Sequence, residues 1–427
     1  MNNIDNTLAY AQSQDAQDPL AKFRDEFHIP QQANGNNEYY FVGNSLGLQP
    51  KRTRQYLNDE LDKWQALGVK GHFDCEYPWM PYHEFLTEQS AALVGALPEE
   101  VVVMNSLTAN LHFMMVTFYQ PTNTRFKILI EEHAFPSDHY AVESQIKHHG
   151  FAPESALITV KPRTGEEVLH PEDIQHIIEQ QGDEIALILL PGVQYYTGQV
   201  MDMKSITEQA HAKGIKVGFD LAHAAGNLEM SLHDWNVDFA CWCNYKYLNS
   251  GPGAVAGCFI HQRHVQNTSL NRFAGWWGHD KSTRFQMGNE FNAIPTAEGW
   301  QLSNPPIFSL AAIRASLDVF KEAGGMKPLR AKSLKLTNYL EQLLIAELGD
   351  RVAIITPQND NERGCQLSLS VSMEGKSGKE VFKQLEEAGV TTDWREPNVI
   401  RCAPVPLYNN FEDCWHFVQI LKQCLLA

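Results

Sequence analysis

The chain has 427 residues, of which 43% are hydrophobic and 20% are charged, the composition of an ordinary folded protein with more than one domain. Acidic side chains number 51 against 34 basic ones, and the net charge of −17 argues against a nucleic-acid partner. No apolar run approaches the roughly 20 residues that a membrane-spanning helix needs, so we expect no membrane insertion.

The first 20 residues are polar and lack the basic and apolar regions of a signal peptide. We therefore expect a cytoplasmic protein that begins with a frayed tail. The eight cysteines show neither C-x-x-C pairs nor the Cys/His spacing of zinc sites, which predicts buried reduced thiols and no metal.

Residues 98–261 alternate between short apolar runs and amphipathic stretches. The apolar runs predict strands at 101–104, 126–130, 156–160, 185–190, 216–220, 238–243 and 254–260. The amphipathic stretches predict helices at 137–149, 171–181 and 202–213. Strands that are apolar on both faces, with helices between them, indicate an α/β fold whose mostly parallel sheet is covered by helices. Ligands of such sheets bind at the carboxyl ends of the strands.

After residue 305 the pattern changes to that of a smaller α+β domain. Two long helices are predicted at 309–323 and 328–347, then strands in RVAIIT, CQLSLSV, VTTDW and NVIRCAP, with a helix near 378–388 before the last two. We divide the chain into an N-terminal arm (1–50), a large domain (51–305) and a small C-terminal domain (306–427).

Two segments that follow predicted strands have the residues of a helix start. The first runs from Asn105 to Thr108, and the second is FPSD at 135–138. A helix start can bind phosphate through its free N–H groups and its dipole, and Phe135 offers a flat apolar face to an aromatic ring. An ordinary capped helix is the commoner explanation of the first segment and an equally good explanation of the second.

Asp220 ends the predicted strand 216–220, and His223 follows three residues later. An aspartate at a strand end can pair with a pyridinium nitrogen and keep it protonated, which makes the ring an electron sink. The alternative is a helix-capping aspartate beside a hydrogen-bonded histidine. Metal ligation is disfavoured because no further Asp or His lies at an obvious spacing.

Lys246 follows the next predicted strand, 246 − 220 = 26 residues after Asp220. A lone lysine at a strand end is usually solvated. An aspartate on one strand and a lysine after the next are, however, the arrangement that a Schiff base of pyridoxal 5′-phosphate (PLP) requires, because a desolvated lysine amine is a nucleophile. The four features together predict a PLP enzyme.

Eight segments carry a resemblance to a known family. They are GNSLG (43–47), NSLTANLH (105–112), FPSDHY (135–140), GFDLAHAAGN (218–227), DFACWCNYKYLN (238–249), GWWGH (275–279), SNPPI (303–307) and IRCAPVPLYN (400–409). In this order they closely resemble the kynureninases, fold-type I PLP enzymes related to the class V aminotransferases. The matches run from about residue 40 to 420, and GFDLAH followed by CNYKYLN is the specific part.

The resemblance implies that PLP forms a Schiff base with Lys246, that Asp220 pairs with the pyridine nitrogen and that Phe135 stacks on the ring. It makes Tyr245 the general acid. The other residues that it places around the cofactor are Leu107, Thr108, Ser137, Asp138, His223, Asn304 and, from the second subunit of a homodimer, Trp276.

The resemblance also implies a substrate pocket. Arg401 resembles the clamp for the α-carboxylate, which suits a planar guanidinium; the alternative is a surface salt bridge. The remaining pocket residues are Ser45, His72, His279, Ser303 and Asn304. A His and an Asn in this pocket resemble the family members that favour the 3-hydroxylated substrate. Pro191 departs from members that carry a hydroxyl residue near the cofactor.

The implied reaction is hydrolysis of L-kynurenine or 3-hydroxy-L-kynurenine to anthranilate or 3-hydroxyanthranilate and L-alanine, a step of tryptophan catabolism and NAD biosynthesis. A cysteine desulfurase or selenocysteine lyase is the nearest alternative, but it needs a nucleophilic cysteine on a mobile loop, and Cys365 leads into a predicted strand. The fold would also suit an ordinary transaminase or a non-catalytic binding protein.

Overall fold

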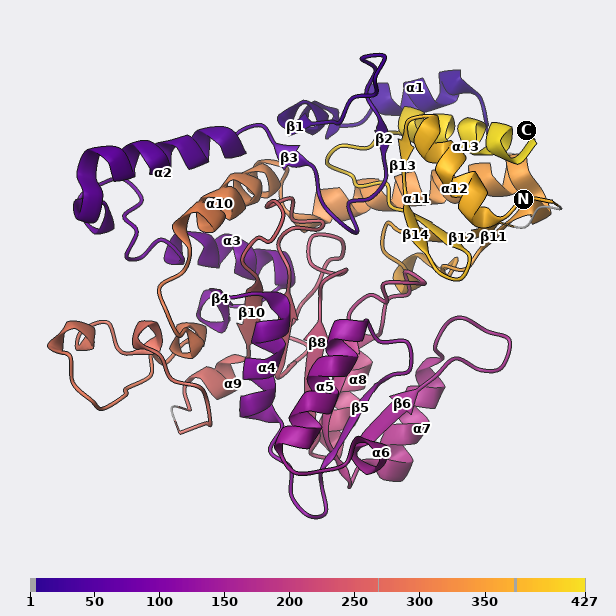
Figure 1. The fold of residues 1–427 in the computed structure, drawn as a ribbon. Coiled ribbons are helices and arrows are strands. Elements are labelled where there is room, and N and C mark those ends of the chain that lie inside the picture. Colours follow the sequence, from indigo (N-terminus) through magenta and orange to yellow (C-terminus); the bar gives the residue numbers. More distant parts are fainter. Residues whose placement is uncertain (1–4, 268, 372–374, 427) are drawn as a thin grey trace.

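The computed structural model describes residues 5–267, 269–371 and 375–426 (Figure 1). Its largest element is a seven-stranded sheet of order β4-β10-β9-β8-β7-β5-β6. The strands are β4 (Val101–Val103), β5 (Lys127–Glu131), β6 (Leu157–Val160), β7 (Ile185–Pro191), β8 (Lys216–Asp220), β9 (Phe239–Trp242) and β10 (Gly257–Ile260). Each lies within or next to a predicted strand. Of these seven, β10 alone runs antiparallel to the other six, which confirms the mostly parallel sheet.

Helices cover both faces of this sheet. Helices α4 (Leu107–Phe118) and α5 (Pro136–His148) pack on one face, where they share a core with Ile128 and Ile130. The opposite face, which includes Leu129, packs against α3, α7 and α8. The bounds of these helices are Glu84–Val94, Pro171–Gln181 and Met203–Ala212. Successive strand residues point to opposite faces, so both faces need the apolar side chains that the sequence shows.

The small domain contains a four-stranded antiparallel sheet of order β11-β12-β15-β14. Its strands are β11 (Val352–Ile354), β12 (Leu367–Val371), β14 (Asp393–Arg395) and β15 (Val399–Cys402). Three helices share a separate hydrophobic core with it, namely α11 (Met326–Leu348), α12 (Gly378–Glu387) and α13 (Phe411–Leu426). The predicted α+β character is confirmed.

Two further helices and several short elements complete the structure. Helix α2 (Thr53–Leu67) packs on α10 (Ile307–Glu322). The short elements are β1 (Phe27–His28), β2 (Tyr39–Tyr40), β3 (Gln49–Pro50), α6 (Pro153–Ala156), α9 (Gln262–Val265) and β13 (Val390–Thr391). Strand β2 pairs in parallel with β13, so part of the N-terminal arm joins the small domain.

The prediction of a frayed N-terminal tail is wrong, because α1 (Leu8–Ala16) lies against α13 (Figure 1). Thr7 caps α1 by accepting the N–H of Tyr10 at 3.2 Å. The Asp15 carboxylate in turn accepts the backbone N–H groups of Phe411 and Glu412 at 2.8 and 2.9 Å, which caps α13. The helix propensity of this polar segment is too weak to predict α1 from the sequence, because the helix depends on tertiary contacts.

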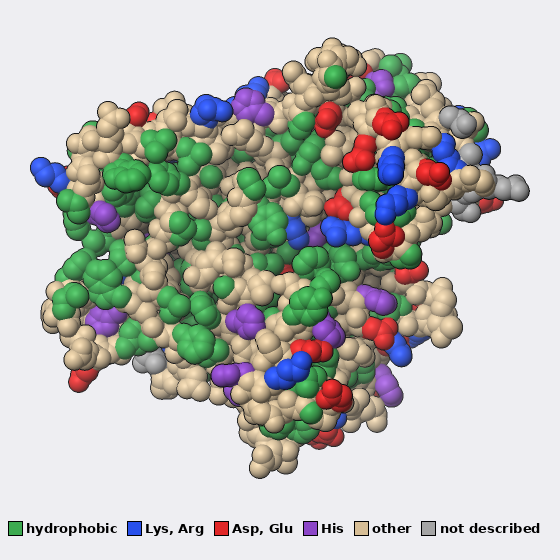
Figure 2. Space-filling model, in the orientation of Figure 1, with side chains coloured by type: hydrophobic (Ala, Val, Ile, Leu, Met, Phe, Trp, Pro, Cys, Tyr) green, Lys and Arg blue, Asp and Glu red, His purple; other side chains and the backbone are tan. Residues whose placement is uncertain are grey.

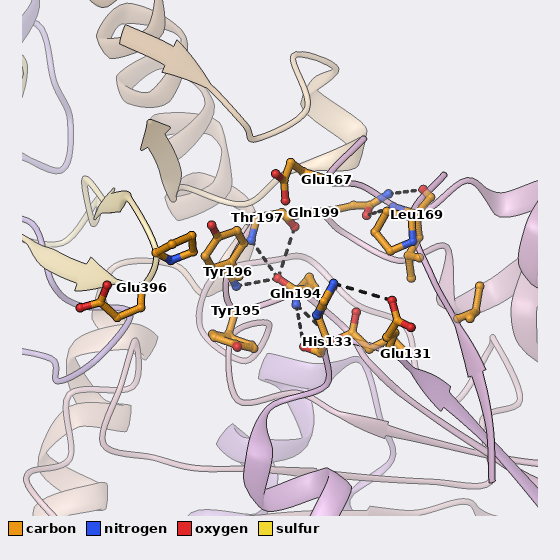
Figure 3. A pocket seen from close by; sticks show the side chains of 14 residues that line it. Glu131, His133, Glu167, Leu169, Gln194, Tyr195, Tyr196, Thr197, Gln199 and Glu396 are labelled. Atoms are coloured by element: carbon orange, nitrogen blue, oxygen red, sulfur yellow. Dashed lines mark hydrogen bonds and ion pairs between the residues drawn. The ribbon is translucent and has the colours of Figure 1, made fainter. Parts of the chain in front are cut away.

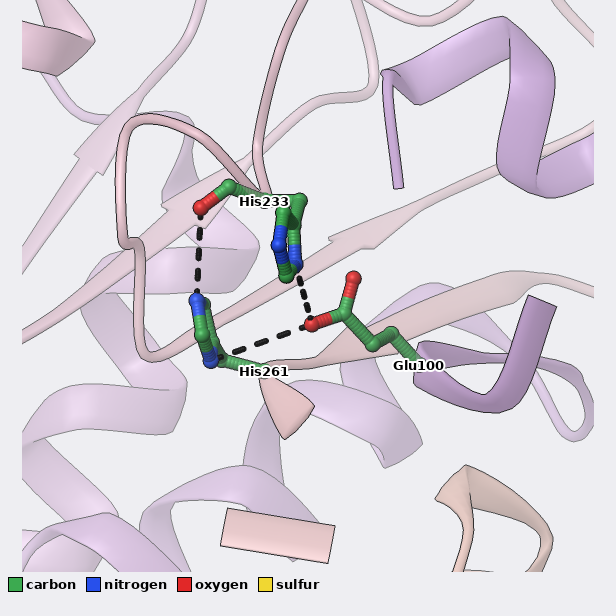
Figure 4. Close-up of side chains that lie close together, drawn as sticks. All are labelled: Glu100, His233 and His261. Atoms are coloured by element: carbon green, nitrogen blue, oxygen red, sulfur yellow. Dashed lines mark hydrogen bonds and ion pairs between the residues drawn. The ribbon is translucent and has the colours of Figure 1, made fainter. Parts of the chain in front are cut away.

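A cluster of Glu100, His233 and His261 (Figure 4) lies at the end of the sheet opposite the carboxyl ends of the parallel strands, because Glu100 precedes β4 and His261 follows the antiparallel β10. The buried Glu100 carboxylate accepts N–H groups from Leu97 at 2.8 Å and Gln262 at 2.7 Å, and His233 Nδ1 lies 2.9 Å from it. His261 Nε2 lies 3.3 Å from the carbonyl oxygen of His233. Because the three side chains have partners within the chain, we assign the cluster a structural role in fixing these loops.

Candidate active site

A cavity of about 270 Å³ opens at the carboxyl ends of the parallel strands. It brings together nine of the residues singled out in the sequence: Leu107, Thr108, Phe135, Ser137, Asp138, Asp220, His223, Tyr245 and Lys246. Pro191, at the end of β7, also lines it and lies beside Asp220 in the strand register. The cavity is therefore where the topology of the sheet predicts a ligand.

Lys246 lies in the loop that follows β9, and its side chain points into the cavity. Its Nζ donates a hydrogen bond to His223 Nε2 at 2.9 Å and lies 5.9 Å from the centre of the Phe135 ring. Burial, followed by the positive charges of Lys246 and Arg401, holds the pKa of His223 well below its usual range. The imidazole is therefore neutral and accepts from the lysine, while its buried Nδ1 has no partner among the described residues.

Asp220 forms a carboxyl pair with Asp138 beside Lys246. Strand pairing sets Asp220 next to Cys241 of β9, so Asp220 and Lys246 follow neighbouring strands as the sequence predicts. Burial raises the pKa of both carboxyl groups, and the two hydrogen bond to each other. The backbone N–H of Ala222 also donates to Asp220 at 2.7 Å. A cation that binds here would favour the ionised form of Asp220.

The two helix starts predicted from the sequence both border the cavity, but neither has the expected side-chain cap. Helix α4 begins after Ser106 and α5 after Phe135, and no side-chain hydrogen bond caps either start. Instead the hydroxyl groups of Thr108 and Ser137 lie 2.7 Å apart and hydrogen bond to each other. The first N–H groups of α4 therefore remain available to an anion, together with these two hydroxyls.

The GNSLG loop packs against the lysine segment. The backbone N–H of Gly47 donates to the carbonyl of Tyr245 at 2.9 Å, and a Cβ atom on Gly47 would lie 2.2 Å from the carbonyl oxygen of Lys246. Only glycine fits this approach. Ser45, two residues earlier, is half-buried and does not line the cavity.

Arg401 lies on β15 and is buried, so it is not the surface salt bridge that we considered as an alternative. One terminal nitrogen, Nη1, donates to the carbonyl of Tyr195 at 2.6 Å, and the other, Nη2, donates to the Asp393 carboxylate at 2.5 Å. Burial lowers the pKa of the guanidinium. Its predicted contact with a substrate carboxylate stays a prediction.

Two predicted substrate-pocket residues flank Trp79 rather than the Lys246 cavity. The His72 ring meets Trp79 edge-on at 5.2 Å between ring centres. Asn304 and Trp79 line a separate apolar cavity of about 370 Å³. Ser303 is exposed beside Asn304. Within one chain this pocket is separate from Lys246.

Trp276 and His279 lie in the segment around 270–300, which extends from the left side of the molecule in Figure 1. Trp276 is 46% exposed, and its Nε1 donates to the carbonyl of Arg284 at 3.0 Å. His279 Nε2 lies 2.9 Å from the Thr283 hydroxyl. Neither side chain lines the cavity of its own chain.

The sequence did not single out Glu131 and Tyr195, which line both the Lys246 cavity and a neighbouring one (Figure 3). Burial raises the pKa of Glu131 to about 8, and Gln194 Nε2 lies 3.4 Å from its carboxylate. The Tyr195 ring packs edge-on against Phe135 at 5.3 Å. Glu131 could have been found by the same signal as Asp220, because each is an acidic residue at the end of an apolar strand. Tyr195 lies in a turn that has no such signal.

Comparison with known proteins identifies the family. The chain is 56% identical to the kynureninase of Koribacter versatilis, over 97% of each chain, and 54% identical to that of Myxococcus xanthus, over 98% of this chain and 97% of the relative. The chain belongs to the kynureninase family. The family model of the kynureninase C-terminal domain also matches residues 329–421.

Solved structures show the fold. A cysteine desulfurase from Thermococcus onnurineus matches with a TM-score of 0.73 and 16% identity, over 91% of this chain and 95% of its own. A mutant of a lyase with glycine linked covalently to its PLP cofactor matches with a TM-score of 0.75 and 15% identity, over 90% and 96%. The architecture is thus PLP fold-type I. Among the described residues, no helix is both long and apolar enough to cross a membrane.

Proposed function

We propose that the chain hydrolyses the Cβ–Cγ bond of L-kynurenine or 3-hydroxy-L-kynurenine and releases L-alanine with anthranilate or 3-hydroxyanthranilate. The observation that carries this proposal is Lys246 in the strand-end cavity beside Asp220, in a chain that is 56% identical to a kynureninase. Incubation of the PLP-loaded protein with L-kynurenine should release anthranilate and alanine in equal amounts. A keto acid in place of alanine would instead support a transaminase.

The cavity fits PLP. The uncapped start of α4 and the hydroxyls of Thr108 and Ser137 suit its phosphate. The exposed Phe135 ring suits its aromatic ring, and Asp220 suits the pyridine nitrogen. Lys246 supplies the amine for its covalent link. When bound, the cofactor supplies an electron sink for charge that develops on the substrate.

The residues of the chain would then move the protons. We assign removal of the Cα proton to the Lys246 amine, which the neutral His223 imidazole holds at 2.9 Å. Burial raises the pKa of the Tyr245 phenol, so this group is protonated at neutral pH and can donate to Cβ when the bond to Cγ breaks. One water adds to the γ-carbonyl and becomes part of the aromatic acid.

The cysteines disfavour a desulfurase. Seven of the eight are buried, and Cys75 is half-buried. Cys365 is 1% exposed, and burial raises the pKa of its thiol to about 12, so it cannot act as a mobile thiolate. We also propose a cytoplasmic location, which the free thiols of all eight cysteines suit.

We further propose a homodimer with shared active sites. Exposed aromatic and apolar side chains cluster on the left side of the molecule, over α2, the loop after it and the 270–300 segment (Figure 2). They include Trp64, Val69, Phe73, Phe273, Trp276, Phe285 and Met287. A large exposed apolar surface of this kind indicates a protein interface. A second copy that covers it could place its Trp276 at the phosphate, as the resemblance implies.

Mixed dimers test the placement of Trp276. Trp276→Ala should weaken PLP binding, and Lys246→Ala should be inactive. If Trp276 serves the partner's site, a mixed dimer of the two variants contains one site with both residues intact, so activity should exceed that of either variant alone. The measurement is anthranilate release after the two variants are unfolded together and refolded. No gain on mixing would show that Trp276 acts within its own chain or has no role.

The substrate preference tests the predicted aryl pocket. If a second copy of the chain brings its His72 and Asn304 to the Lys246 cavity, where they hydrogen bond the aromatic hydroxyl, kcat/KM should be about tenfold higher for 3-hydroxy-L-kynurenine than for L-kynurenine. Replacing Asn304 by alanine should reduce this ratio while activity on L-kynurenine changes less. Parallel turnover assays measure both values. A preference for the unhydroxylated substrate would refute the role of these two residues.

A further inference from the structure

Glu131 is a carboxyl group of the Lys246 cavity to which the proposed mechanism gives no role. It ends β5 and is 3% exposed. The other two carboxyl groups of this cavity, those of Asp138 and Asp220, hydrogen bond to each other, whereas Glu131 lies outside that pair. A buried carboxyl group in a ligand cavity is a candidate for proton transfer.

Gln194 fixes the Glu131 side chain from one side (Figure 3). Its amide nitrogen lies 3.4 Å from Glu131 Oε1 and 3.2 Å from the carbonyl oxygen of His133. Its amide oxygen accepts the backbone N–H groups of Tyr196 and Thr197 at 2.6 and 2.8 Å, which sets the orientation of the amide. The second carboxylate oxygen of Glu131, Oε2, has no hydrogen-bond partner among the residues that the structure describes, so it is available to a water.

Glu131 also lines a second cavity of about 320 Å³ beside the first. Glu131 and Tyr195 belong to both linings, so the two side chains form the boundary between the cavities. The walls of the second cavity include Glu132 and His133, whose side chains are exposed to solvent. A polar cavity that opens to solvent can hold water. The second cavity can therefore supply water to the Glu131 carboxylate.

The environment of Glu131 suits a general base. Burial raises its pKa to about 8, with the hydrogen bond from Gln194 opposing this shift and the negative charge of Asp220 adding to it. A general base works best when its pKa lies close to the working pH, because it must both take up and release a proton. Lys246 follows β9, whereas Glu131 ends β5, with β8 and β7 between them. The two groups therefore serve different sides of the cavity, as two separate proton transfers require.

We propose that the Glu131 carboxylate is the general base that takes a proton from the water as the water adds to the γ-carbonyl of the substrate. This inference rests on the proposed function, because it assumes a substrate carbonyl in the Lys246 cavity. It gives a role to a carboxyl group that neither the cofactor nor the Asp138–Asp220 pair occupies.

The bonds and protons balance in this step. One O–H bond of the water breaks and its proton passes to Glu131, while the water oxygen bonds to Cγ and the carbonyl electron pair moves to the carbonyl oxygen. The carbonyl then re-forms as part of the aromatic acid as the Cβ–Cγ bond breaks, and Cβ takes the Tyr245 proton. Glu131 passes its proton to solvent water and Tyr245 takes one back, which restores both groups.

The two proton transfers can be measured separately. Exchange of the Cα proton of L-alanine with deuterium from heavy water needs Lys246 but no hydration step, whereas anthranilate release from L-kynurenine needs both. With PLP bound, Glu131→Gln should lower the rate of anthranilate release by about 10²–10⁴-fold and leave the rate of Cα exchange unchanged. Glu131→Asp, which keeps a carboxylate, should recover part of the lost rate. Nuclear magnetic resonance of L-alanine and an assay of anthranilate on one preparation measure the two rates.

Glu132→Gln is the matched control, because Glu132 is the next residue, carries an ordinary carboxylate and lines only the second of the two cavities. It should leave both rates unchanged. Anthranilate release at the unaltered rate in Glu131→Gln would overturn the inference, and so would an equal loss of both rates, which would indicate a role in cofactor binding or folding. An unaltered protein that exchanges the Cα proton of L-alanine but releases no anthranilate from L-kynurenine would contradict the proposed function instead.

Discussion

Lys246→Ala should abolish turnover of kynurenine and, at the same time, the visible absorbance that PLP has when it is linked to a lysine. The side chain has two roles in the proposal, the covalent link and the transfer of the Cα proton, and its Nζ is the lysine nitrogen in the described cavity. Loss of a proton-transfer group alone costs about 10²–10⁴-fold in rate, and loss of the link adds to this. Absorption spectra and anthranilate release measured on one preparation test both effects.

Lys204→Ala is the matched control for this prediction. Lys204 lies on α8, its side chain is exposed, and it forms an ion pair with Glu208 at 3.9 Å. The control should keep the spectrum and the activity of the unaltered protein. Full activity in Lys246→Ala would contradict the assignment of this lysine, whatever its spectrum.

Asp220→Asn should lower kcat by roughly 10²- to 10⁴-fold while PLP stays bound. Removal of one partner from a buried charge pair costs about 3–5 kcal/mol, and each 1.36 kcal/mol of barrier is a factor of ten in rate. In the PLP-loaded protein this pair would be the Asp220 carboxylate and the protonated pyridine nitrogen, whose charge an asparagine amide could not balance. Steady-state kinetics on PLP-saturated protein measure the loss.

A measurement of thermal stability distinguishes a loss of kcat in Asp220→Asn from a folding defect. In the protein without PLP, Asp220 and Asp138 are buried carboxyls whose pKa values are raised by burial. Asp220→Asn removes one of these ionisable groups, so thermal unfolding of the PLP-free variant should occur at the same temperature or a higher one. Asp138→Asn can still hydrogen bond to Asp220 and should lose less activity. Equal losses in the two variants would contradict the distinct role of Asp220.

The sheet could be predicted well because its strands are buried on both faces. Runs such as 185–190 and 239–243 are apolar throughout, and helices of regular amphipathic pattern separate the predicted strands. Helix α1 could not be predicted in this way, because it depends on the contact between Asp15 and the start of α13, 396 residues later in the chain. Capping at α4 was also expected and is absent, since a hydroxyl near a helix start can bond elsewhere.

The centre of the site could be predicted from the order of Asp220 and Lys246, because parallel strands end at one edge of a sheet. The ion pair of Arg401 with Asp393 was not predicted, since it arises from the β14–β15 strand pairing that brings the two residues together. The placement of Trp276 and His279 came from the resemblance alone. Both lie outside the cavity of their own chain, so their predicted contacts with the site require a second subunit.

Reduction of the PLP-loaded protein with borohydride tests the central claim most directly, because it fixes the cofactor permanently to the lysine that holds it. Peptide mass mapping should then find the cofactor on Lys246, and the loss of anthranilate release should follow the fraction of Lys246 that is labelled. A cofactor fixed to a different lysine, or full kynurenine hydrolysis after complete labelling of Lys246, would contradict the account.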